Sequence, residues 1–149
     1  MIALRPATRD DGDRCYRLHR AAMRPHVEAV WGWDEQDQRV RHERAFDPAR
    51  TRIITVGGVD AGVLIVDHRP AEIELGRIEI HPDFQGRGVG TRLIRGLLDE
   101  AAGSGRVVVL EVLTVNPRAH ALYRRLGFAE VGDREPGDVK VRMRADPRR

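Results

Sequence analysis

The feature that most constrains the fold is a run of alternating glycines, Gly86, Gly88 and Gly90, between two different kinds of element. The segment before it, residues 72–80 (EIELGRIEI), is typical of a β-strand, and His81-Pro82 ends it. Beyond it, apolar residues recur at helical spacing, at Leu93, Ile94, Leu97, Leu98 and Ala101. Glycines in a strand-to-helix turn allow a tight bend and expose backbone N–H groups beside the positive end of the helix. The sequence therefore predicts that this turn binds the phosphate groups of a cofactor.

The size and composition of the chain indicate one globular domain. With 149 residues it can bury a substantial core, so we expect a single domain over residues 1–149. No stretch approaches the roughly 18 apolar residues of a membrane span, and residues 1–13 lack an apolar signal region. The single cysteine, Cys15, excludes an internal disulfide and a cysteine-rich zinc site. We therefore expect a cytoplasmic protein that binds neither a membrane nor a metal.

The charge balance argues against a dedicated nucleic-acid-binding protein. The net charge is +3 although 33% of the residues are charged, whereas such a protein concentrates an excess of Lys and Arg on one face. Much of the excess lies near the C-terminus, at Lys140, Arg142, Arg144, Arg148 and Arg149. No nucleic-acid partner is expected.

Two helices are predicted ahead of the central strands. Thr8, with Asp11 three residues later, predicts the N-terminus of a helix that runs to about Met23 and is ended by Pro25. A second helix is expected from about residue 34 to before the proline at position 48.

The remaining pattern predicts a mixed α/β order. Gly57-Gly58 indicates a hairpin turn, and Asn116-Pro117 begins a short helix that Gly127 ends. Strands are expected at residues 2–5, 52–56, 61–67, 72–80, 107–112, 129–131 and 138–143. The predicted order is β-α-α-β-β-β-α-β-α-β-β.

Three kinds of phosphate-binding loop compete for the glycine run. A P-loop requires GxxxxGK[ST], which the chain lacks, and in a Rossmann fingerprint the last glycine would come one residue later. Residues 78–91 (IEIHPDFQGRGVGT) and 109–128 (VLEVLTVNPRAHALYRRLGF) fit a third pattern. Together they resemble the GNAT family of acyl-CoA-dependent N-acetyltransferases, through its (Q/R)xxGx(G/A) motif and its fifth strand and fourth helix. The resemblance is strong over about residues 78–131.

The resemblance implies a fold and a cofactor. The fold is a single mixed, largely antiparallel sheet with splayed central parallel strands flanked by helices, the acyl-CoA N-acyltransferase fold. The co-substrate is acetyl-CoA, with the acyl group in the gap between the splayed strands and a main-chain N–H near Ile80 facing the thioester carbonyl. The cofactor-binding residues implied are Ile78, Glu79, Ile80, Gln85, Gly86, Arg87, Gly88, Val89, Gly90, Thr91, Asn116 and Tyr123.

Two carboxylates compete as the base in the implied chemistry. An amine must lose a proton to attack, and the resemblance places Glu111, five residues before Asn116, in the position of a base that acts through water. Glu79 on the preceding strand is the competitor, and the resemblance slightly favours Glu111. Tyr123 is expected to donate to the departing sulfur. For both glutamates a solvated or salt-bridged strand carboxylate is an interpretation at least as well supported. For Tyr123 the alternative is a core side chain, and for Asn116 it is a helix cap.

Specificity is expected in residues 23–37 (MRPHVEAVWGWDEQD). Trp31 and Trp33 there stand close to Glu28 and Asp34, and aromatic faces beside carboxylates suit a cationic amine. The competing interpretation is that the tryptophans anchor a helix corner and the acids cap the second helix.

The sequence thus predicts an acetyl-CoA-dependent N-acetyltransferase that moves an acetyl group to a primary amine through a tetrahedral intermediate. The amine is a small molecule or a peptide. The alternative is a catalytically inactive CoA-binding regulatory module. A toxin-like enzyme acting on charged tRNA is a weaker third, because the chain lacks the expected basic patch. A homodimer is one possibility, and the sequence does not determine the oligomeric state.

Overall fold

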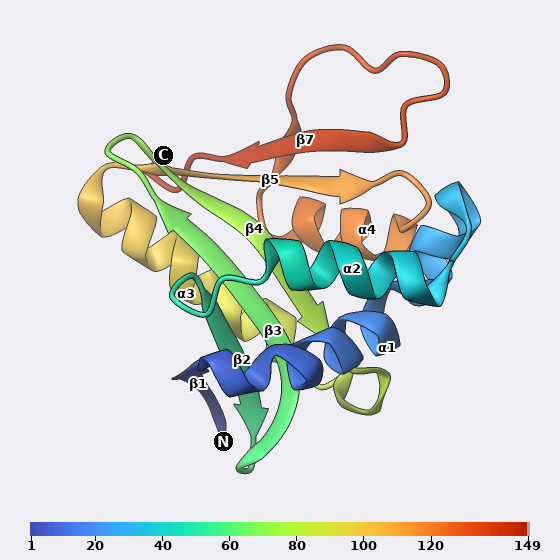
Figure 1. The fold of residues 1–149 in the computed structure, drawn as a ribbon. Coiled ribbons are helices and arrows are strands. Elements are labelled where there is room, and N and C mark those ends of the chain that lie inside the picture. Colours follow the sequence, from blue (N-terminus) through green and yellow to red (C-terminus); the bar gives the residue numbers. More distant parts are fainter. Residues whose placement is uncertain (149) are drawn as a thin grey trace. The chain divides into compact units, whose positions relative to one another are not determined.

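The computed structural model describes residues 1–148. Arg149, the end of the predicted domain and of its basic C-terminus, lies outside them. The elements are β1 (Ile2–Pro6), the 3-10 turn η1 (Arg9–Asp11), α1 (Gly12–Trp31), α2 (Glu35–Ala45), β2 (Thr51–Val56), β3 (Val59–His68), β4 (Glu72–Ile80), the 3-10 turn η2 (Pro82–Phe84), α3 (Val89–Ser104), β5 (Val107–Leu113), α4 (Pro117–Arg125), β6 (Ala129–Glu130) and β7 (Lys140–Ala145) (Figure 1). The predicted order of strands and α-helices is confirmed.

The strands hydrogen-bond in the order β1-β2-β3-β4-β5-β7-β6 over the described residues. β4 and β5 run parallel, with Glu72–Leu75 opposite Val107–Leu110, whereas β1–β2, β2–β3, β5–β7 and β6–β7 are antiparallel. The prediction of a mixed, largely antiparallel sheet flanked by helices is therefore confirmed. Within residues 1–148, no helix is both long and apolar enough to cross a membrane.

The chain divides into two compact units, which are described separately. Unit 1 comprises residues 1–65 and 77–89, and unit 2 comprises residues 66–76 and those from Gly90 onward. Both β3 and β4 contribute residues to each unit, and the division within β4 falls after Gly76.

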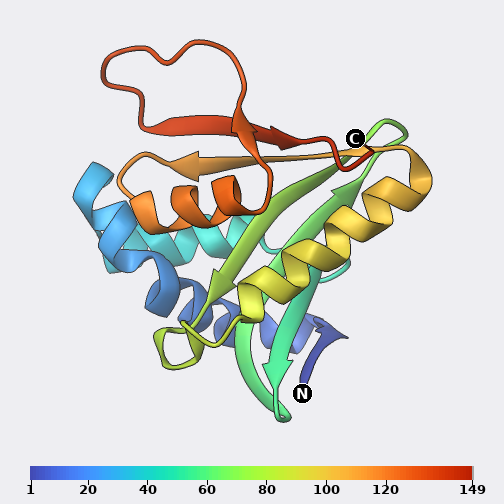
Figure 2. The same ribbon diagram turned by 180° about the vertical axis from the view of Figure 1, so that it is seen from behind.

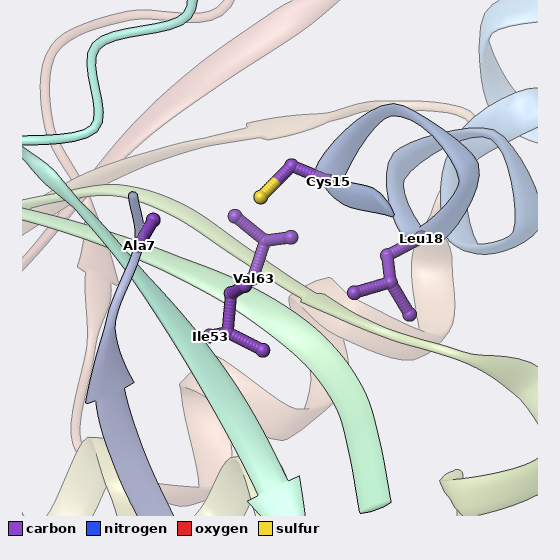
Figure 3. Close-up of a cluster of buried hydrophobic side chains, with 5 residues drawn as sticks. All are labelled: Ala7, Cys15, Leu18, Ile53 and Val63. Carbon is purple, nitrogen blue, oxygen red and sulfur yellow. The ribbon is translucent and has the colours of Figure 1, made fainter. Parts of the chain in front are cut away.

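Unit 1 contains β1, β2 and most of β3, with α1 and α2 on the side that faces the viewer in Figure 1. The predicted hairpin between β2 and β3 turns at Gly57 and Gly58, which have φ of 58° and 81°. α1 packs against these strands through a buried apolar cluster (Figure 3), with Phe46 at its edge; its members are Ala7, Cys15, Leu18, Ile53 and Val63. Removal of this apolar surface from water stabilises the position of α1.

The prediction that Pro25 ends the first helix is wrong, because α1 continues to Trp31 with Pro25 inside it. A proline removes the hydrogen bond of its own nitrogen, and the neighbouring turns tolerate this loss. Arg24 and Glu28, on either side of Pro25, form an ion pair at 3.5 Å. The helix ends at Gly32, whose φ of 76° is readily adopted by glycine and whose N–H donates to the carbonyl of Glu28.

Thr8 and Asp11 form the predicted capping interaction, but they do so in the turn η1, so that α1 begins at Gly12. The Asp11 carboxylate accepts hydrogen bonds from the Thr8 backbone N–H at 2.8 Å and from its hydroxyl at 3.2 Å. Arg5 donates to both oxygens of the same carboxylate. These hydrogen bonds, above all those from Arg5, lower the pKa of Asp11 to about 2.

Unit 2 is built on β5, with α3 and α4 on the side that faces the viewer in Figure 2. β7 begins two residues later than predicted and extends to Ala145, because its antiparallel pairing with β5 runs from Lys140 opposite Leu113 to Ala145 opposite Val108. Asp138, the predicted first residue of this strand, instead accepts a hydrogen bond from the Glu135 backbone N–H at 2.8 Å.

Candidate active site

The glycine run forms an exposed loop between β4 and α3. Gly86 and Gly88 both have φ of 76°, a backbone conformation that favours glycine. The Gln85 side-chain amide donates to the carbonyl of Ile80 at 2.8 Å and so ties the loop back to the end of β4. A Cβ built at Gly88 meets no described atom within 4 Å, so the space beside this backbone is open. An exposed, glycine-dependent loop that leads into a helix N-terminus fits a pyrophosphate group.

The residues that follow the loop anchor the start of α3. Val89, its first residue, is buried, whereas Gly90 and Thr91 are half-buried. The backbone N–H groups of a first helical turn have no partner within their own helix and are available to an anion. Arg87 is exposed, with its guanidinium 5.2 Å from the centre of the Phe84 ring.

Glu79 is a buried carboxylate near the end of β4. Its neighbours Ile78 and Ile80 are half-buried, whereas Glu79 is only 6% exposed. His19 on α1 places Nδ1 at 2.9 Å and 3.0 Å from the two Glu79 oxygens. Arg77, two residues earlier on the same face of β4, has Nε at 3.5 Å from Glu79 Oε2. The carboxylate therefore has a cationic partner and an imidazole partner within unit 1.

Gly62 on β3 lets the backbone of β4 approach at Glu79. A Cβ built at Gly62 would overlap the carbonyl oxygen of Glu79 and would lie 3.2 Å from the Ile54 side chain. One residue before it, Ala61 accepts a hydrogen bond from the His81 N–H at 2.8 Å. Absence of a side chain at Gly62 is therefore part of what positions Glu79.

Trp33 lies beside this pair, whereas Trp31 does not bury its ring. The rings of Trp33 and His19 are 6.2 Å apart between centres, and the Arg24 guanidinium lies 5.7 Å from the Trp33 ring. Among residues 1–148, no group accepts a hydrogen bond from the buried Trp33 indole N–H. Trp31, the last residue of α1, is 57% exposed.

The two acidic residues predicted with the tryptophans have structural partners. Asp34 is the N-cap of α2 and accepts from the Asp37 backbone N–H at 2.9 Å, as the competing interpretation expects. Glu28 pairs with Arg24 on the surface of α1. The structure thus brings Trp33 to the His19–Glu79 pair and leaves Asp34 in a capping position.

A second polar network joins α1 to α2. Tyr16 donates to Glu35 Oε2 at 2.5 Å, and Arg20 donates to Glu35 Oε1 at 2.6 Å. The hydrogen bonds from Tyr16 and then Arg20 lower the pKa of Glu35 to about 2, and burial with this hydrogen bond raises the pKa of Tyr16 to about 12. The Arg39 guanidinium stacks on the Tyr16 ring at 4.6 Å. This network holds the two helices that flank residues 32–34.

In unit 2, Asn116 and Tyr123 lie at the two ends of α4. The Asn116 side-chain oxygen accepts from the Ala119 backbone N–H at 3.2 Å, so Asn116 is the N-cap of the helix. Tyr123 is 8% exposed, and its ring meets Phe128 edge to face with 5.8 Å between centres. Gly127, with φ of 99°, lies between the helix and Phe128.

Glu111 on β5 occupies a very different environment from Glu79. It is exposed, whereas Leu110 and Val112 on either side are buried. Its partner in the antiparallel register is Arg142 on β7. In the sequence, Glu79 and Glu111 have nearly equal standing as the base. The fold buries Glu79 and leaves Glu111 exposed.

His19 is a site residue that the sequence analysis does not predict. A signal was present, because His19 is four residues after Cys15 and three before Ala22, both of which line the buried face of α1. A polar side chain on the buried face of a helix needs a hydrogen-bond partner elsewhere in the fold. What the sequence could not show is that Glu79, 60 residues later, meets this side chain.

Comparison with known proteins assigns the family. The sequence model of the acetyltransferase (GNAT) family matches residues 13–128. The N-alpha-acetyltransferase RimI of Mycobacterium tuberculosis is 54% identical over 63 residues, which are 42% of this chain and 39% of that protein. The [ribosomal protein bS18]-alanine N-acetyltransferase of Salmonella typhimurium is 47% identical over 60 residues, 40% of each chain. The matches thus span about two-fifths of the length of these relatives.

Solved structures show the same fold over nearly the whole chain. The PaiA N-acetyltransferase of Thermoplasma acidophilum, solved with coenzyme A, has a TM-score of 0.76 at 14% identity and covers 98% of this chain and 99% of its own. The ribosomal-protein-S18-alanine N-acetyltransferase of Escherichia coli has a TM-score of 0.68 at 23% identity and covers 97% of this chain and 93% of its own. With the family match over residues 13–128, these findings mean that the chain belongs to the GNAT family of acetyltransferases.

Proposed function

We propose that this protein is an acetyl-CoA-dependent N-acetyltransferase that transfers the acetyl group to a primary amine by direct attack. The observation that carries the proposal is the exposed loop after β4, in which Gly86 and Gly88 adopt positive φ immediately before α3. In a chain of the GNAT family, such a loop is suited to the pyrophosphate of CoA. The acetyl thioester supplies an activated acyl group.

The proposed cofactor contacts follow the family resemblance. Backbone N–H groups of residues 85–91 hold the pyrophosphate, and the backbone of residues 78–80 pairs with the pantetheine arm. A backbone N–H near Ile80 stabilises the oxyanion that forms during attack. In unit 2, the Asn116 amide contributes a further contact, and Tyr123 donates a hydrogen bond to the departing sulfur. The burial of Tyr123 in an apolar environment is compatible with such a directed donor.

The environments of the two carboxylates now favour Glu79 for a role in proton transfer. Glu79 is buried and hydrogen-bonded to His19, an arrangement typical of catalytic groups, whereas Glu111 is exposed on β5 opposite Arg142. Glu111 stays a candidate, acting through water.

The substrate class we propose is the α-amine of a protein N-terminus. Two relatives, an N-alpha-acetyltransferase and a bS18-alanine N-acetyltransferase, carry names that describe this chemistry. Trp33, which lies beside His19, is proposed to contact this substrate, with Trp31, Glu28 and Asp34 nearby in sequence. An action on a ribosomal protein would also agree with a cytoplasmic location.

A thiol-release assay tests the activity. Purified protein is mixed with acetyl-CoA and a panel of amines: peptides with N-terminal alanine, peptides blocked at the N-terminus, and small polyamines. Release of CoA with the free N-terminal peptides supports the proposal. Binding of acetyl-CoA without CoA release across the panel would instead favour an inactive CoA-binding module.

The phosphate assignment is tested by Gly88→Asp. A side chain at this positive φ strains the loop, and a carboxylate repels the pyrophosphate, so we expect acetyl-CoA affinity to fall at least tenfold. Titration calorimetry measures the dissociation constant, with Gly96→Ala in the middle of α3 as the control. Unchanged affinity in Gly88→Asp would contradict the assignment.

A further inference from the structure

The His19–Glu79 pair defines which ring nitrogen of His19 carries a hydrogen. Nδ1 lies within 3.0 Å of both Glu79 oxygens, and an ionised carboxylate can only accept hydrogen bonds. The Arg77 guanidinium is a second donor group beside the same carboxylate, with Nε at 3.5 Å from Oε2. In the neutral ring, Nδ1 is therefore the nitrogen that carries the hydrogen, and Nε2 carries the lone pair.

The Nε2 atom of His19 is available to a substrate. No group among residues 1–148 forms a hydrogen bond with it, and the side chain retains 13% exposure. Three of the other five histidines differ in this respect, because the Nε2 atoms of His42, His68 and His120 lie within 3.1 Å of an oxygen atom of the protein. Among the described residues, His19 thus has a carboxylate partner at Nδ1 and an acceptor without a protein partner at Nε2.

The pair also lies where the proposed chemistry takes place within unit 1. Glu79 belongs to residues 78–80, the segment of β4 proposed to contact the acetyl thioester. Trp33, beside the His19 ring, belongs to the segment proposed to contact the amine. The charged or titratable groups that face the pair are Arg77 on β4 and His42 on α2.

We propose that Nε2 of His19 accepts the proton that the substrate amine loses, and that Glu79 is a positioning residue that holds the ring and stabilises the imidazolium. This assignment rests on the proposed function. Glu79 is less suited to take the proton itself, because both of its oxygens already accept from His19. In general, an imidazole also titrates closer to neutral pH than a carboxylate does.

The step balances in atoms and charge. The amine nitrogen forms a bond to the thioester carbonyl carbon, and its proton passes to Nε2. Collapse of the tetrahedral intermediate breaks the carbon–sulfur bond and releases the CoA thiolate. The thiolate is protonated, and the imidazolium returns its proton to solvent, so that an amine and a thioester become an amide and a thiol.

The first test is substitution of His19 with chemical rescue. In His19→Ala we expect kcat for an N-terminal alanine peptide to fall 10²- to 10⁴-fold, with little change in acetyl-CoA affinity. Added imidazole should restore part of the lost rate, because it supplies the missing base. Imidazole should not rescue Tyr123→Phe. His68→Gln, which alters another histidine–glutamate pair, should keep full activity.

Three results would contradict the role of His19 as the proton acceptor. If His19→Gln keeps kcat within twofold, or if the rate lost in His19→Ala is insensitive to imidazole in a protein with unchanged thermal unfolding, the assignment is wrong. If the unsubstituted protein binds acetyl-CoA but acetylates no amine, the proposed function fails and the assignment falls with it.

A second test does not depend on activity. In protein labelled with ¹⁵N-histidine, the nitrogen chemical shifts of His19 report the tautomer. We expect a protonated Nδ1 and an unprotonated Nε2 at a pH where the ring is neutral, and a loss of this preference in Glu79→Ala. A protonated Nε2 in the neutral ring would overturn the proposal, because that atom could not accept the proton.

Discussion

The position of the Glu79 carboxylate depends both on donor groups around it and on the absence of a side chain at a neighbouring residue. His19 and Arg77 hold its oxygens, while the missing side chain at Gly62 leaves room for its backbone. A buried charge is tolerated only where partners compensate for its lost hydration. Small changes beside Glu79 should therefore affect both stability and catalysis.

Gly62→Ala tests this dependence. The new Cβ would overlap the Glu79 carbonyl oxygen, which is backbone and cannot rotate away, so β3 or β4 must shift. We expect a loss of about 1–3 kcal/mol in the free energy of unfolding, and a lower kcat. Chemical denaturation and the thiol-release assay measure the two effects. Gly96→Ala is the matched control, since its Cβ meets nothing within 4 Å, and it should stabilise α3 by about 0.5–1 kcal/mol. Equal stability of the two variants would contradict the packing argument.

At the scale of elements, the ends of the helices are specified by single residues. Gly32 ends α1, Asp34 caps α2, and Asn116 caps α4. Each of these residues satisfies or redirects a backbone group that the helix itself leaves without a partner. For Asn116, the cap is the interaction that the structure contains, and the proposed contact with the pantetheine arm is additional.

Substitution of Asn116 separates these two roles. Asn116→Ala should lower the free energy of unfolding by about 1 kcal/mol, because the Ala119 N–H loses its acceptor. Asn116→Asp retains the accepting oxygen and should keep the stability, but it lacks an amide donor. We expect its affinity for acetyl-CoA to fall below that of the unsubstituted protein in calorimetry. Unchanged affinity in Asn116→Asp would limit Asn116 to the cap.

Across the whole molecule, the net charge is small, but many charged side chains form ion pairs or hydrogen bonds with specific partners. The pKa of Asp11 is lowered to about 2, mainly by its hydrogen bonds from Arg5, and the pKa of Asp60 is lowered by Arg5 as well. Burial lowers the pKa of His42 below its usual value. In all three groups the folded state binds protons less readily than the unfolded state, so that acid favours unfolding.

Stability should therefore decline in two steps as the pH falls. The first begins near pH ~6.5, where the unfolded state protonates His42 more readily than the folded state does. In the second, the contribution of Asp11 is complete above pH ~4 and is lost as the pH falls toward its folded-state pKa of about 2.

Variants at these positions test the two steps in urea denaturation across pH. His42→Gln should remove the first step. Asp11→Asn should reduce the second step, to which Asp60 and Glu35 also contribute, at a cost of about 1 kcal/mol at pH 7, since the Arg5 partner is partly exposed. Asp99→Asn, on the exposed side of α3, should leave both steps in place. Identical acid profiles in Asp11→Asn and Asp99→Asn would contradict the assignment.

Much of the fold could be predicted because its signals are local. The glycine loop, the strand at residues 72–80 and the cap at Asn116 depend on turn geometry and on periodicity within a few residues. The prediction at Pro25 is wrong because the loss of the hydrogen bond that a proline removes did not end the helix. The helix continues for six residues beyond Pro25, to Trp31. The candidate site could be predicted only in part. The glycine motif is a contiguous stretch and is visible in the sequence, whereas His19 is 60 residues away from its partner Glu79.

The order of the elements, the glycine loop and the family follow from the sequence alone, because each of these depends on residues that are close together in the chain. The burial of Glu79 rather than Glu111, the contact of His19 with Glu79 and the capping role of Asp34 are visible only in the folded chain. Those outcomes depend on which side chains meet after the backbone folds, and a histidine and a glutamate 60 residues apart carry no sign of their contact until α1 packs on its unit.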